Sequence, residues 1–583
     1  MTHRHSISHR QRLLVAAQVV AALAIFTLNH SLSLVRNHGD YVPFSVGHRV
    51  SGLVYDETHA YAATARRFVR TGHLPSKLDV ADSADRVRSL PVLNGVFIGS
   101  VAYLSGNLEA TWMCLHGALP ALIWLLIYRM LATFTAGQLL PSVGAWVSTL
   151  VPFAPRSAVL LGPSSLIQPL EITRMPGPAV TFLLLLLAVV VVARALADGG
   201  VFRLSAAGVV CGLLFYSYYF SWISMFVGLG TLLLVSAVAR SGWTGRLFLI
   251  LLIGSVVGLP QVGMTLWSIS HGAPSDMMAR VGYFERTVRP MGLLVFVAAA
   301  ILLVTLVTVS RRSAVRRPSD RALALILVLT SVAIGAGFGC NLHVFSGYQA
   351  QHGHFLTRVI HPVVFIIGFI AIAFVLGRCT PSVRRAGHVA MLVGALTCVT
   401  LGIFRQVQVA VRTGDDHRAS APRVDVARWL RAHVAADSVV AAFDGQLIAL
   451  VPAFTGTWTF APLGNRTTVS DGEILVRYLL AAYLEGRDLK RVGDDLLVEH
   501  PATNRLWPQP VWRHWSRRRL GPELSDALPQ TIANLDAKAA LSKRRLDYFL
   551  LPSDRSGDRI ADLYPQAKVI YTNDAWSVID VGR

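Results

Sequence analysis

The sequence predicts a mainly α-helical, polytopic membrane protein of about eleven spans, with an extracytoplasmic α/β domain at its C-terminal end. Two observations carry this prediction. Hydrophobic residues make up 53% of the chain and charged residues only 15%, which is too little polar surface for a soluble protein of 583 residues. The apolar residues also gather in runs, such as 181–196 and 293–309, that meet or approach the ~20 residues needed to cross a bilayer.

Basic residues set the predicted orientation. Arg4, Arg10 and Arg12 precede the first apolar run, and the short gaps at 311–317 and 378–385 are rich in arginine. Because short cytoplasmic loops carry an excess of lysine and arginine, we place the N-terminus and these gaps on the cytoplasmic side of the cytoplasmic (inner) membrane. The formal net charge of +21 is therefore no indication of nucleic-acid binding.

We expect eleven apolar segments to span the membrane: 13–35, 109–132, 139–154, 177–196, 203–219, 221–239, 246–266, 291–310, 321–338, 356–377 and 387–408. The apolar segment 90–105 is short for a span, at roughly 24 Å of helix. The alternation of inner and outer gaps holds only if this segment does not cross, so we predict a helix at the outer face. The same alternation requires a break near 216–222.

This path divides the chain into a transmembrane domain, 1–408, and an extracytoplasmic domain, 409–583. Four loops lie outside, at 36–108, 155–176, 267–290 and 339–355. In the tail, the patterns predict helices at 424–434, 473–485 and 523–546, strands at 439–443 and 547–552, and a hairpin over 568–581 that turns at Asn573 and Asp574.

The first outer loop contains the most informative stretch, YDETHAYAATARRFVRTGHLP at 55–75. Asp56 and Glu57 stand at an expected helix start, where the helix dipole favours carboxylates. Arg66, Arg67 and Arg70 alternate with apolar residues, which suits a helix lying in the membrane interface with its arginines toward lipid headgroups. Alternatively, Asp56 only caps this helix.

The other outer loops add polar and basic groups at the same membrane face. Several cations beside an acidic pair suit a ligand with a phosphate at the bilayer surface. Taken singly, the arginines also suit contacts with lipid headgroups. The candidate substrate-binding residues are Glu171, Arg174, Arg280, Arg286, Tyr348, Gln351, His354 and Arg358.

Two further patterns have structural explanations. Gly335, Gly337 and Gly339 lie within an apolar span, so we predict close helix packing rather than a phosphate-binding loop. The aromatic residues at 216–222 are typical of an interfacial belt, and lining a substrate cavity is the alternative.

The order of these features resembles the GT-C class of membrane glycosyltransferases. That class includes the protein O-mannosyltransferases, the aminoarabinose transferase of lipid A and the catalytic subunit of oligosaccharyltransferase. The resemblance rests on an N-terminal span, an outer loop that opens Y-D-E-x-x-x-Y-x-x-x-A at Tyr55, a short apolar helix, many spans and an outer α/β tail. The start of the tail, 424–440, is also similar to that of bacterial members.

The resemblance implies transfer of a sugar from a polyprenyl-phosphate donor to a lipid, glycan or protein acceptor at the outer face of the membrane. Asp56, with Glu57 beside it, matches the acid that activates the acceptor or holds a divalent cation such as Mg²⁺ or Mn²⁺. Glu171 would be the second acid of such a metal site. Arg280, Arg286 and Arg358 are the candidates to bind the donor phosphate. The second outer loop departs from the family pattern, because it has no paired acid motif.

Three other functions stay open. A transporter or flippase would fit the spans, although intramembrane charges are sparse and no inverted repeat is evident. A polysaccharide polymerase or ligase would use a similar substrate, but we expect such an enzyme to concentrate its function in a large loop late in the chain. A non-catalytic assembly protein is the third.

Overall fold

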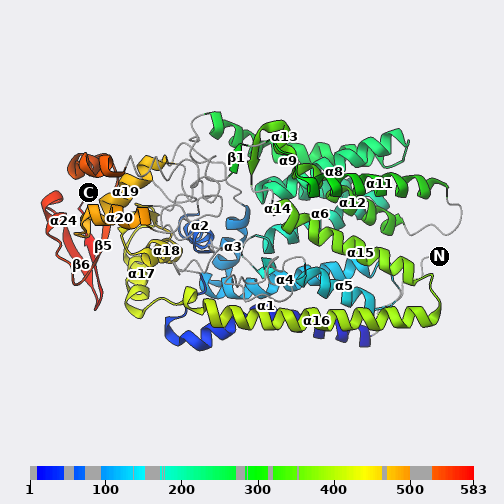
Figure 1. The fold of residues 1–583 in the computed structure, drawn as a ribbon, viewed down its shortest axis with the longest axis horizontal. Helices are drawn as coiled ribbons and strands as arrows, with labels where there is room; N and C mark the ends of the chain where they lie inside the picture. The colour runs from blue at the N-terminus through cyan, green and yellow to red at the C-terminus, as the bar shows by residue number, and fades with distance from the viewer. Residues whose placement is uncertain are drawn as a thin grey trace.

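The computed structural model describes residues 9–44, 58–72, 93–135, 137–151, 171–173, 175, 177–270, 282–284, 286–312, 320–350, 353–461, 469–498 and 528–582. The molecule is elongated, with a bundle of long helices at one end and a mixed α/β tail at the other (Figure 1).

Each of the eleven predicted spans is a helix. Nine helices of the described chain are long and apolar enough to cross a membrane by length and composition, and α5 and α7 are shorter apolar helices. These helices confirm the predicted polytopic membrane protein. They are α1 (His9–Asn37), α4 (Leu108–Leu131), α5 (Leu139–Leu150), α6 (Ala179–Asp198), α7 (Val201–Leu213), α8 (Tyr219–Val238), α9 (Thr244–Ser270), α11 (Pro290–Arg312), α12 (Asp320–Gly339), α15 (His361–Leu376) and α16 (Pro381–Thr413).

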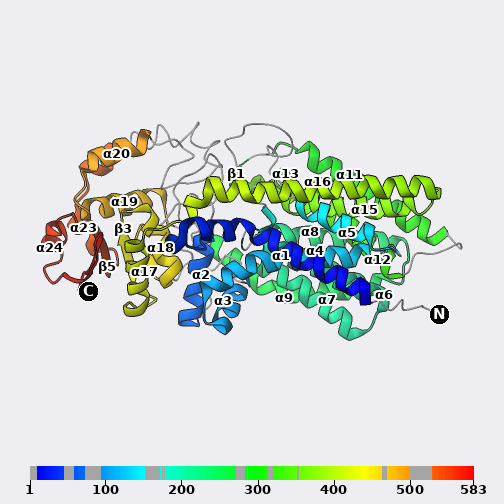
Figure 2. The same cartoon turned by 90° about the horizontal axis from the view of Figure 1, so that it is seen from below.

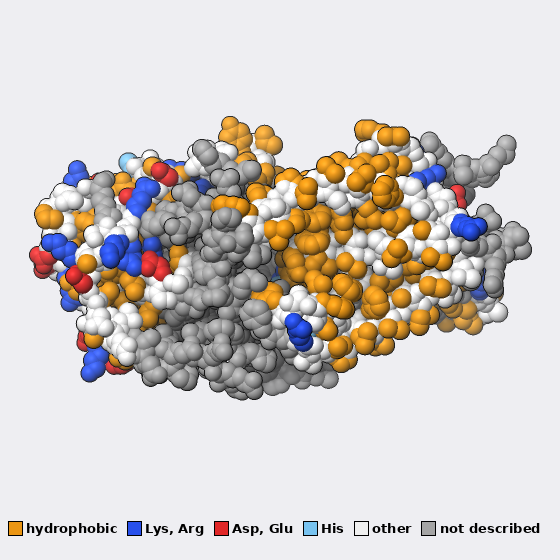
Figure 3. Space-filling view, turned by 90° about the horizontal axis from the view of Figure 1, so that it is seen from above, with side chains coloured by type: hydrophobic (Ala, Val, Ile, Leu, Met, Phe, Trp, Pro, Cys, Tyr) orange, Lys and Arg blue, Asp and Glu red, His pale blue; other side chains and the backbone are white. Residues whose placement is uncertain are grey.

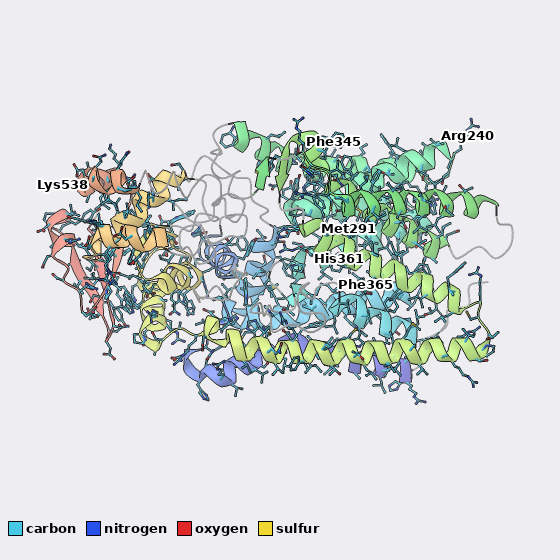
Figure 4. All side chains as sticks on the ribbon, viewed as in Figure 1. Arg240, Met291, Phe345, His361, Phe365 and Lys538 are labelled. Carbon is cyan, nitrogen blue, oxygen red and sulfur yellow. The ribbon has the colours of Figure 1, made fainter. Side chains whose placement is uncertain are left out.

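The surface of the bundle is apolar. Hydrophobic side chains cover the face of the bundle shown in Figure 3, whereas charged side chains gather over the tail. Large side chains such as Ile301 on α11 and Phe404 on α16 are exposed, as expected for helices that contact lipid. Arg240 lies at the end of the bundle farthest from the tail, and Lys538 lies in the tail (Figure 4).

The predicted break between two spans is present. After α7 the chain forms one 3₁₀ turn, η4 (Leu214–Tyr216), and α8 starts at Tyr219. Tyr218, between them, has the extended backbone of a helix N-cap (φ −160°, ψ 126°). This break supports the alternation of inner and outer ends on which the path of the chain rests.

Glycines allow α12 to pack closely against its neighbours. A Cβ added at Gly335 would lie 2.0 Å from the carbonyl oxygen of Ser224 on α8, and one added at Gly337 would lie 2.8 Å from the amide nitrogen of Phe296 on α11. Without a side chain, two helix backbones approach directly. The predicted packing role of these glycines is therefore confirmed.

Two short helices lie between the bundle and the tail, namely α2 (Thr58–Thr71) and α3 (Leu93–Ser105). They pack on each other, since a Cβ added at Gly99 would lie 2.7 Å from the ring of Phe68. The predicted short apolar helix at 90–105 is confirmed as α3, and its 13 residues give about 20 Å of helix, less than a span requires.

The tail is built on a five-stranded sheet of order β4-β3-β5-β7-β6. The strands β3, β4 and β5 are parallel, whereas β7 is antiparallel to both β5 and β6. Asn573 forms the predicted hairpin turn, because its Oδ1 accepts hydrogen bonds from the amides of Ala575 and Trp576. The strands are β3 (Val439–Ala442), β4 (Trp458–Thr459), β5 (Tyr548–Pro552), β6 (Lys568–Thr572) and β7 (Trp576–Asp580).

Helices cover both faces of this sheet. Alternate residues of β3 belong to different cores, with Val440 and Ala442 on one face and Val439 and Ala441 on the other. The first face packs on α17 (Ala421–His433) and α18 (Gly445–Thr455), and the second on α19 (Asp471–Leu484), α23 (Ala537–Ser542) and α24 (Asp558–Leu563). The helix α20 (Leu489–Val498) follows α19.

The helices predicted at 424–434 and 473–485 are confirmed as α17 and α19, and the strands at 439–443 and 547–552 as β3 and β5. The prediction of one helix over 523–546 is wrong in its described part. Residues 528–533 are helical, but Asp536 then takes an extended backbone and its carboxylate accepts a hydrogen bond from the amide of Ala539. This capping bond starts a new helix, α23.

A partly buried acid, Glu473, joins elements on the second face of the tail. The carboxylate of Glu473 accepts hydrogen bonds from Nε of Arg477 at 2.6 Å and from Nε of Arg544 at 2.8 Å. Burial raises the pKa of Glu473, but the hydrogen bonds and charges of Arg544 and Arg477 outweigh it, so the pKa lies below its ordinary value. An acid with a lowered pKa in the folded protein stabilises the fold above its unfolded pKa of about 4.3 and loses this effect as the pH falls.

We therefore expect Glu473→Gln to lower the stability of the tail by roughly 3 kcal/mol at pH 7, because two arginines lose their charged partner. Hydrogen exchange of α19 in the full-length protein measures the change. The difference between variant and wild type should shrink as the pH falls below 4, and an equal difference at pH 7 and pH 3 would contradict the ionic role of Glu473.

Candidate functional site

The structure describes four of the ten predicted site side chains: Arg286, Tyr348, His354 and Arg358. Glu171 begins a short 3₁₀ turn, η3 (Glu171–Thr173), but its side chain lies outside the described part of the chain. The remaining five lie outside the described residues altogether; they are Asp56, Glu57, Arg174, Arg280 and Gln351. The roles of all ten stay predictions.

His354 and Arg358 share one partner, Tyr218. The Tyr218 hydroxyl lies 2.7 Å from Nδ1 of His354, and Nη1 of Arg358 donates a hydrogen bond to the same hydroxyl. The guanidinium carbon of Arg358 is 5.4 Å from the centre of the Tyr218 ring. Two predicted site residues, far along the chain from Tyr218, therefore meet at the break between α7 and α8.

Arg358 sits in an unusual part of the backbone. It belongs to a π-helical segment, η5 (Leu356–Ile360), that follows the single turn α14 (Gly353–Phe355) and leads into α15. Such segments are frequent at functional sites, because they turn a side chain out of the regular helical register. His361 and Phe365 in Figure 4 mark the course of α15 away from this segment through the bundle.

The Arg358 side chain is buried, with 6% of its surface exposed. A Cβ added at Gly177 would lie 3.5 Å from Nη1 of Arg358, so the Gly177–Pro178 turn before α6 lies against the guanidinium. The N-terminal end of α6 therefore also packs against the guanidinium of Arg358.

Two buried polar residues, Asn94 and Ser217, connect α3 to the break between α7 and α8. Nδ2 of Asn94 donates to the carbonyl of Ser217 at 3.0 Å, and the Ser217 hydroxyl donates to Oδ1 of Asn94 at 3.1 Å. Both residues are buried, so this pair fixes the N-terminal end of α3 beside Tyr218. We define the outer cluster, named for the membrane face on which the sequence predicts it, as Asn94, Ser217, Tyr218, His354 and Arg358.

Arg286 and Tyr348 lie in the segments next to β1 (Gly282–Phe284) and α13 (Leu342–Ser346). A short antiparallel pair joins β1 and β2 (Tyr348–Ala350), and Nε2 of His343 in α13 lies 2.7 Å from the carbonyl of Thr287. Arg286 is exposed, and its guanidinium lies against Gly347. Burial raises the pKa of the Tyr348 phenol, and the nearby Tyr219 phenol raises it further.

The arginines of α2 correct one interpretation of the sequence. We expected them to face lipid headgroups, but Arg66 and Arg67 are each only 6% exposed. Arg66 pairs with Glu109 at 2.6 Å, and Arg67 and Arg70 donate to carbonyl groups of the tail. These carbonyl groups lie at or just after the C-terminal ends of α17 and α18, where the helix itself offers them no partner, so they accept hydrogen bonds from the arginines.

The sequence did not predict Asn94 and Ser217 as site residues. For Tyr218 it left two alternatives open: part of an interfacial aromatic belt, or the lining of a substrate cavity. The only sequence signal for the first two is that each is polar within an apolar stretch. No group of three or more His, Cys, Asp or Glu side chains that could hold a metal ion occurs in the part of the chain that the structure describes. A cation between Asp56 and Glu171 stays a prediction.

No family model and no curated protein sequence matches this chain. Among solved structures, the chain is similar to ArnT from Cupriavidus metallidurans in the apo state, with 13% sequence identity and a TM-score of 0.42. The likeness covers 97% of this chain and 98% of that chain.

Proposed function

We propose that this chain is a membrane glycosyltransferase of the GT-C type, which transfers a sugar from a polyprenyl-phosphate donor to an acceptor at the outer face of the cytoplasmic membrane. The observation that carries the proposal is the buried guanidinium of Arg358, held with His354 on the Tyr218 hydroxyl at the tail-facing end of an apolar bundle.

A buried arginine among apolar helices suits a lipid-linked anion. Charged groups at membrane depth are costly and usually serve function. The planar guanidinium matches the geometry of a phosphate group, and the imidazole and phenol beside it add further hydrogen-bonding groups. A phosphate at the end of a long lipid tail reaches a site between helices, while its sugar extends toward the tail domain.

The chemistry needs a base and a stabilised leaving group. In the proposed step the acceptor oxygen forms a bond to the anomeric carbon as the bond from that carbon to the phosphate oxygen breaks. Asp56 takes the acceptor proton, and the electron pair leaves with the phosphate, whose charge Arg358 stabilises. One such displacement inverts the anomeric centre, and a product that retains the donor's configuration would contradict this mechanism.

The orientation follows from the arginines of the bundle. Arg240 lies at the end far from the tail (Figure 4). In the sequence, the gaps at 311–317 and 378–385 are rich in arginine. These arginines support the proposed orientation, in which that end and the N-terminus are cytoplasmic and the tail is outside, because short cytoplasmic loops carry an excess of lysine and arginine. The proposed partners are the lipid-linked donor, a lipid, glycan or protein acceptor, and membrane lipids.

The test is transfer of label from polyprenyl-phosphate sugars by membranes that contain the full-length chain. We expect transfer by the wild type and a roughly hundredfold loss in Arg358→Gln, because the departing phosphate loses its cation. The matched control is Arg246→Gln, since the guanidinium of Arg246 also donates a hydrogen bond within the bundle, to the carbonyl of Leu196, but is not part of the outer cluster. Its activity should stay within twofold of the wild type.

Two outcomes would overturn the proposal. The first is the absence of transfer with a panel of polyprenyl-phosphate hexoses and pentoses together with lipid extracts as acceptors, while the protein is folded and abundant. The second is movement of the labelled lipid across the bilayer of reconstituted vesicles without any transfer, which would identify a flippase.

A further inference from the structure

The helix α2, which directly follows Asp56 and Glu57, is held by the tail rather than by the membrane bundle alone. Arg67 makes the principal contact: its Nε donates to the carbonyl of Gly456 at 2.8 Å and its Nη2 to that of Thr457 at 2.9 Å. The guanidinium also lies 3.5 Å from the centre of the Trp458 ring. These three contacts fix the arginine in one geometry.

Arg70, one turn further along α2, makes two more hydrogen bonds to the tail. It donates to the carbonyl of Thr455 at 2.6 Å and to that of Val434 at 2.7 Å. Thr455 is the last residue of α18, and Val434 follows α17. Carbonyl groups at helix C-terminal ends carry partial negative charge and have no partner inside the helix, so two guanidinium groups are well matched to them.

The backbones of α2 and the tail also approach each other closely at Gly456. This residue ends α18 with φ +76°, a left-handed conformation that glycine adopts without strain. A Cβ at this position would lie 3.0 Å from both the amide nitrogen and the Cα of Arg67. The end of α18 is therefore shaped to receive α2.

An apolar core and an ion pair complete this interface. Ala62 and Ala65 of α2 are buried in the same hydrophobic core as Leu447 and Leu450 of α18, and α2 lies between the bundle and the tail in both views of the fold (Figures 1 and 2). Glu109, in the first turn of α4, accepts from Arg66 at 2.6 Å and from Arg431 of α17 at 3.1 Å.

From these contacts we infer that Arg67 and Arg70 are positioning residues of the proposed transfer reaction. Through them the tail fixes α2, the helix that directly follows Asp56 and Glu57 in the sequence, relative to the outer cluster. The tail thereby affects catalysis through the position of α2. This inference rests on the proposed function. It assigns to the tail an effect on the rate of the chemical step and not on the binding of the donor.

The test compares Arg67→Gln, Arg67→Lys and Arg70→Gln in the full-length protein in lipid nanodiscs. The matched control is Arg559→Gln, because Arg559 also donates to two carbonyls, those of Tyr483 and Arg487 at 3.2 Å, but within the tail. Two quantities are measured: kcat and KM for the lipid-linked donor, and hydrogen exchange of residues 58–71. Exchange of α19 reports whether the tail stays folded.

We expect Arg67→Gln to lower kcat at least tenfold while the donor KM changes less than threefold, because a displaced base costs rate without weakening donor binding. Arg70→Gln should act in the same direction. Arg67→Lys should fall between the wild type and Arg67→Gln, since lysine keeps a charge but not the forked geometry. Exchange of α2 should rise in the glutamine variants, while Arg559→Gln changes neither quantity.

A kcat within twofold of the wild type in Arg67→Gln, or a raised KM with unchanged kcat, would overturn the inference. If the wild type itself transfers no sugar, the proposed function fails. Hydrogen exchange of residues 58–71 then decides whether the tail positions α2. Faster exchange of α2 with unchanged α19 then supports the positioning role, and unchanged exchange of α2 overturns it.

Discussion

Replacing Asp56 with asparagine is expected to lower sugar transfer by a factor of roughly 10² to 10⁴, the range by which a positioned general base accelerates a reaction. Asparagine has nearly the same shape but does not take the acceptor proton. The variant should bind the lipid-linked donor with the same affinity, because the donor phosphate is assigned to Arg358 and not to Asp56. Initial rates of label transfer at saturating donor measure this loss.

The choice of asparagine also separates catalysis from helix capping. Asparagine is as good an N-cap as aspartate, so a residue that only caps α2 would tolerate the change. Activity of Asp56→Asn within threefold of the wild type would therefore show that Asp56 is a cap. Glu57→Gln is the companion variant, and a larger loss there than in Asp56→Asn would move the role of base to Glu57.

Among the described glycines of the bundle, Gly335 is expected to show the largest loss of stability when it is replaced by alanine. The new Cβ would lie 2.0 Å from the Ser224 carbonyl oxygen and 2.8 Å from the amide nitrogen of Gly228. Both are backbone atoms of α8, so relief requires α12 and α8 to separate. We expect a loss of about 3 kcal/mol or more, at the upper end of overpacking effects.

Thermal unfolding in detergent micelles, with the yield of folded protein, measures this effect. The matched control is Gly230→Ala on α8, where an added Cβ meets nothing within 4 Å. That variant should equal or exceed the wild type in stability, because alanine has the higher helix propensity by ~1 kcal/mol. Equal unfolding temperatures for Gly335→Ala and the wild type would show that α12 and α8 do not pack as described.

Local patterns of the sequence determine most of the architecture. Apolar runs with arginine-rich gaps predict the spans, because each helix must satisfy its own backbone in lipid. The hairpin at Asn573 and the start of α19 follow from turn and capping residues within a few positions, since Asn573 accepts from the amide of Ala575 and Ser470 accepts from the amide of Glu473. The predicted helix over 523–546 fails for the same local reason, since Asp536 caps a second helix inside a continuous helical pattern.

The candidate site is determined by the sequence only in part. The resemblance implies Asp56 from a motif of about twenty residues, but its geometry lies outside the described residues. In the sequence, His354 is recognisable as a polar group of the predicted outer loop 339–355, and Arg358 as a charged residue near the start of the span predicted at 356–377. Their shared partner, Tyr218, is 140 residues from Arg358 along the chain, and no local pattern connects the two.

By itself, then, the sequence determines that this protein spans the membrane many times, which end of the bundle carries the arginines, and that a small α/β domain follows. Hydrophobicity, charge and turn chemistry act over a few residues and can be read locally. Only the tertiary structure decided that the arginines of α2 bind the tail instead of lipid, and that Tyr218, His354 and Arg358 meet. Those contacts depend on the relative placement of elements hundreds of residues apart, which packing determines and local pattern does not.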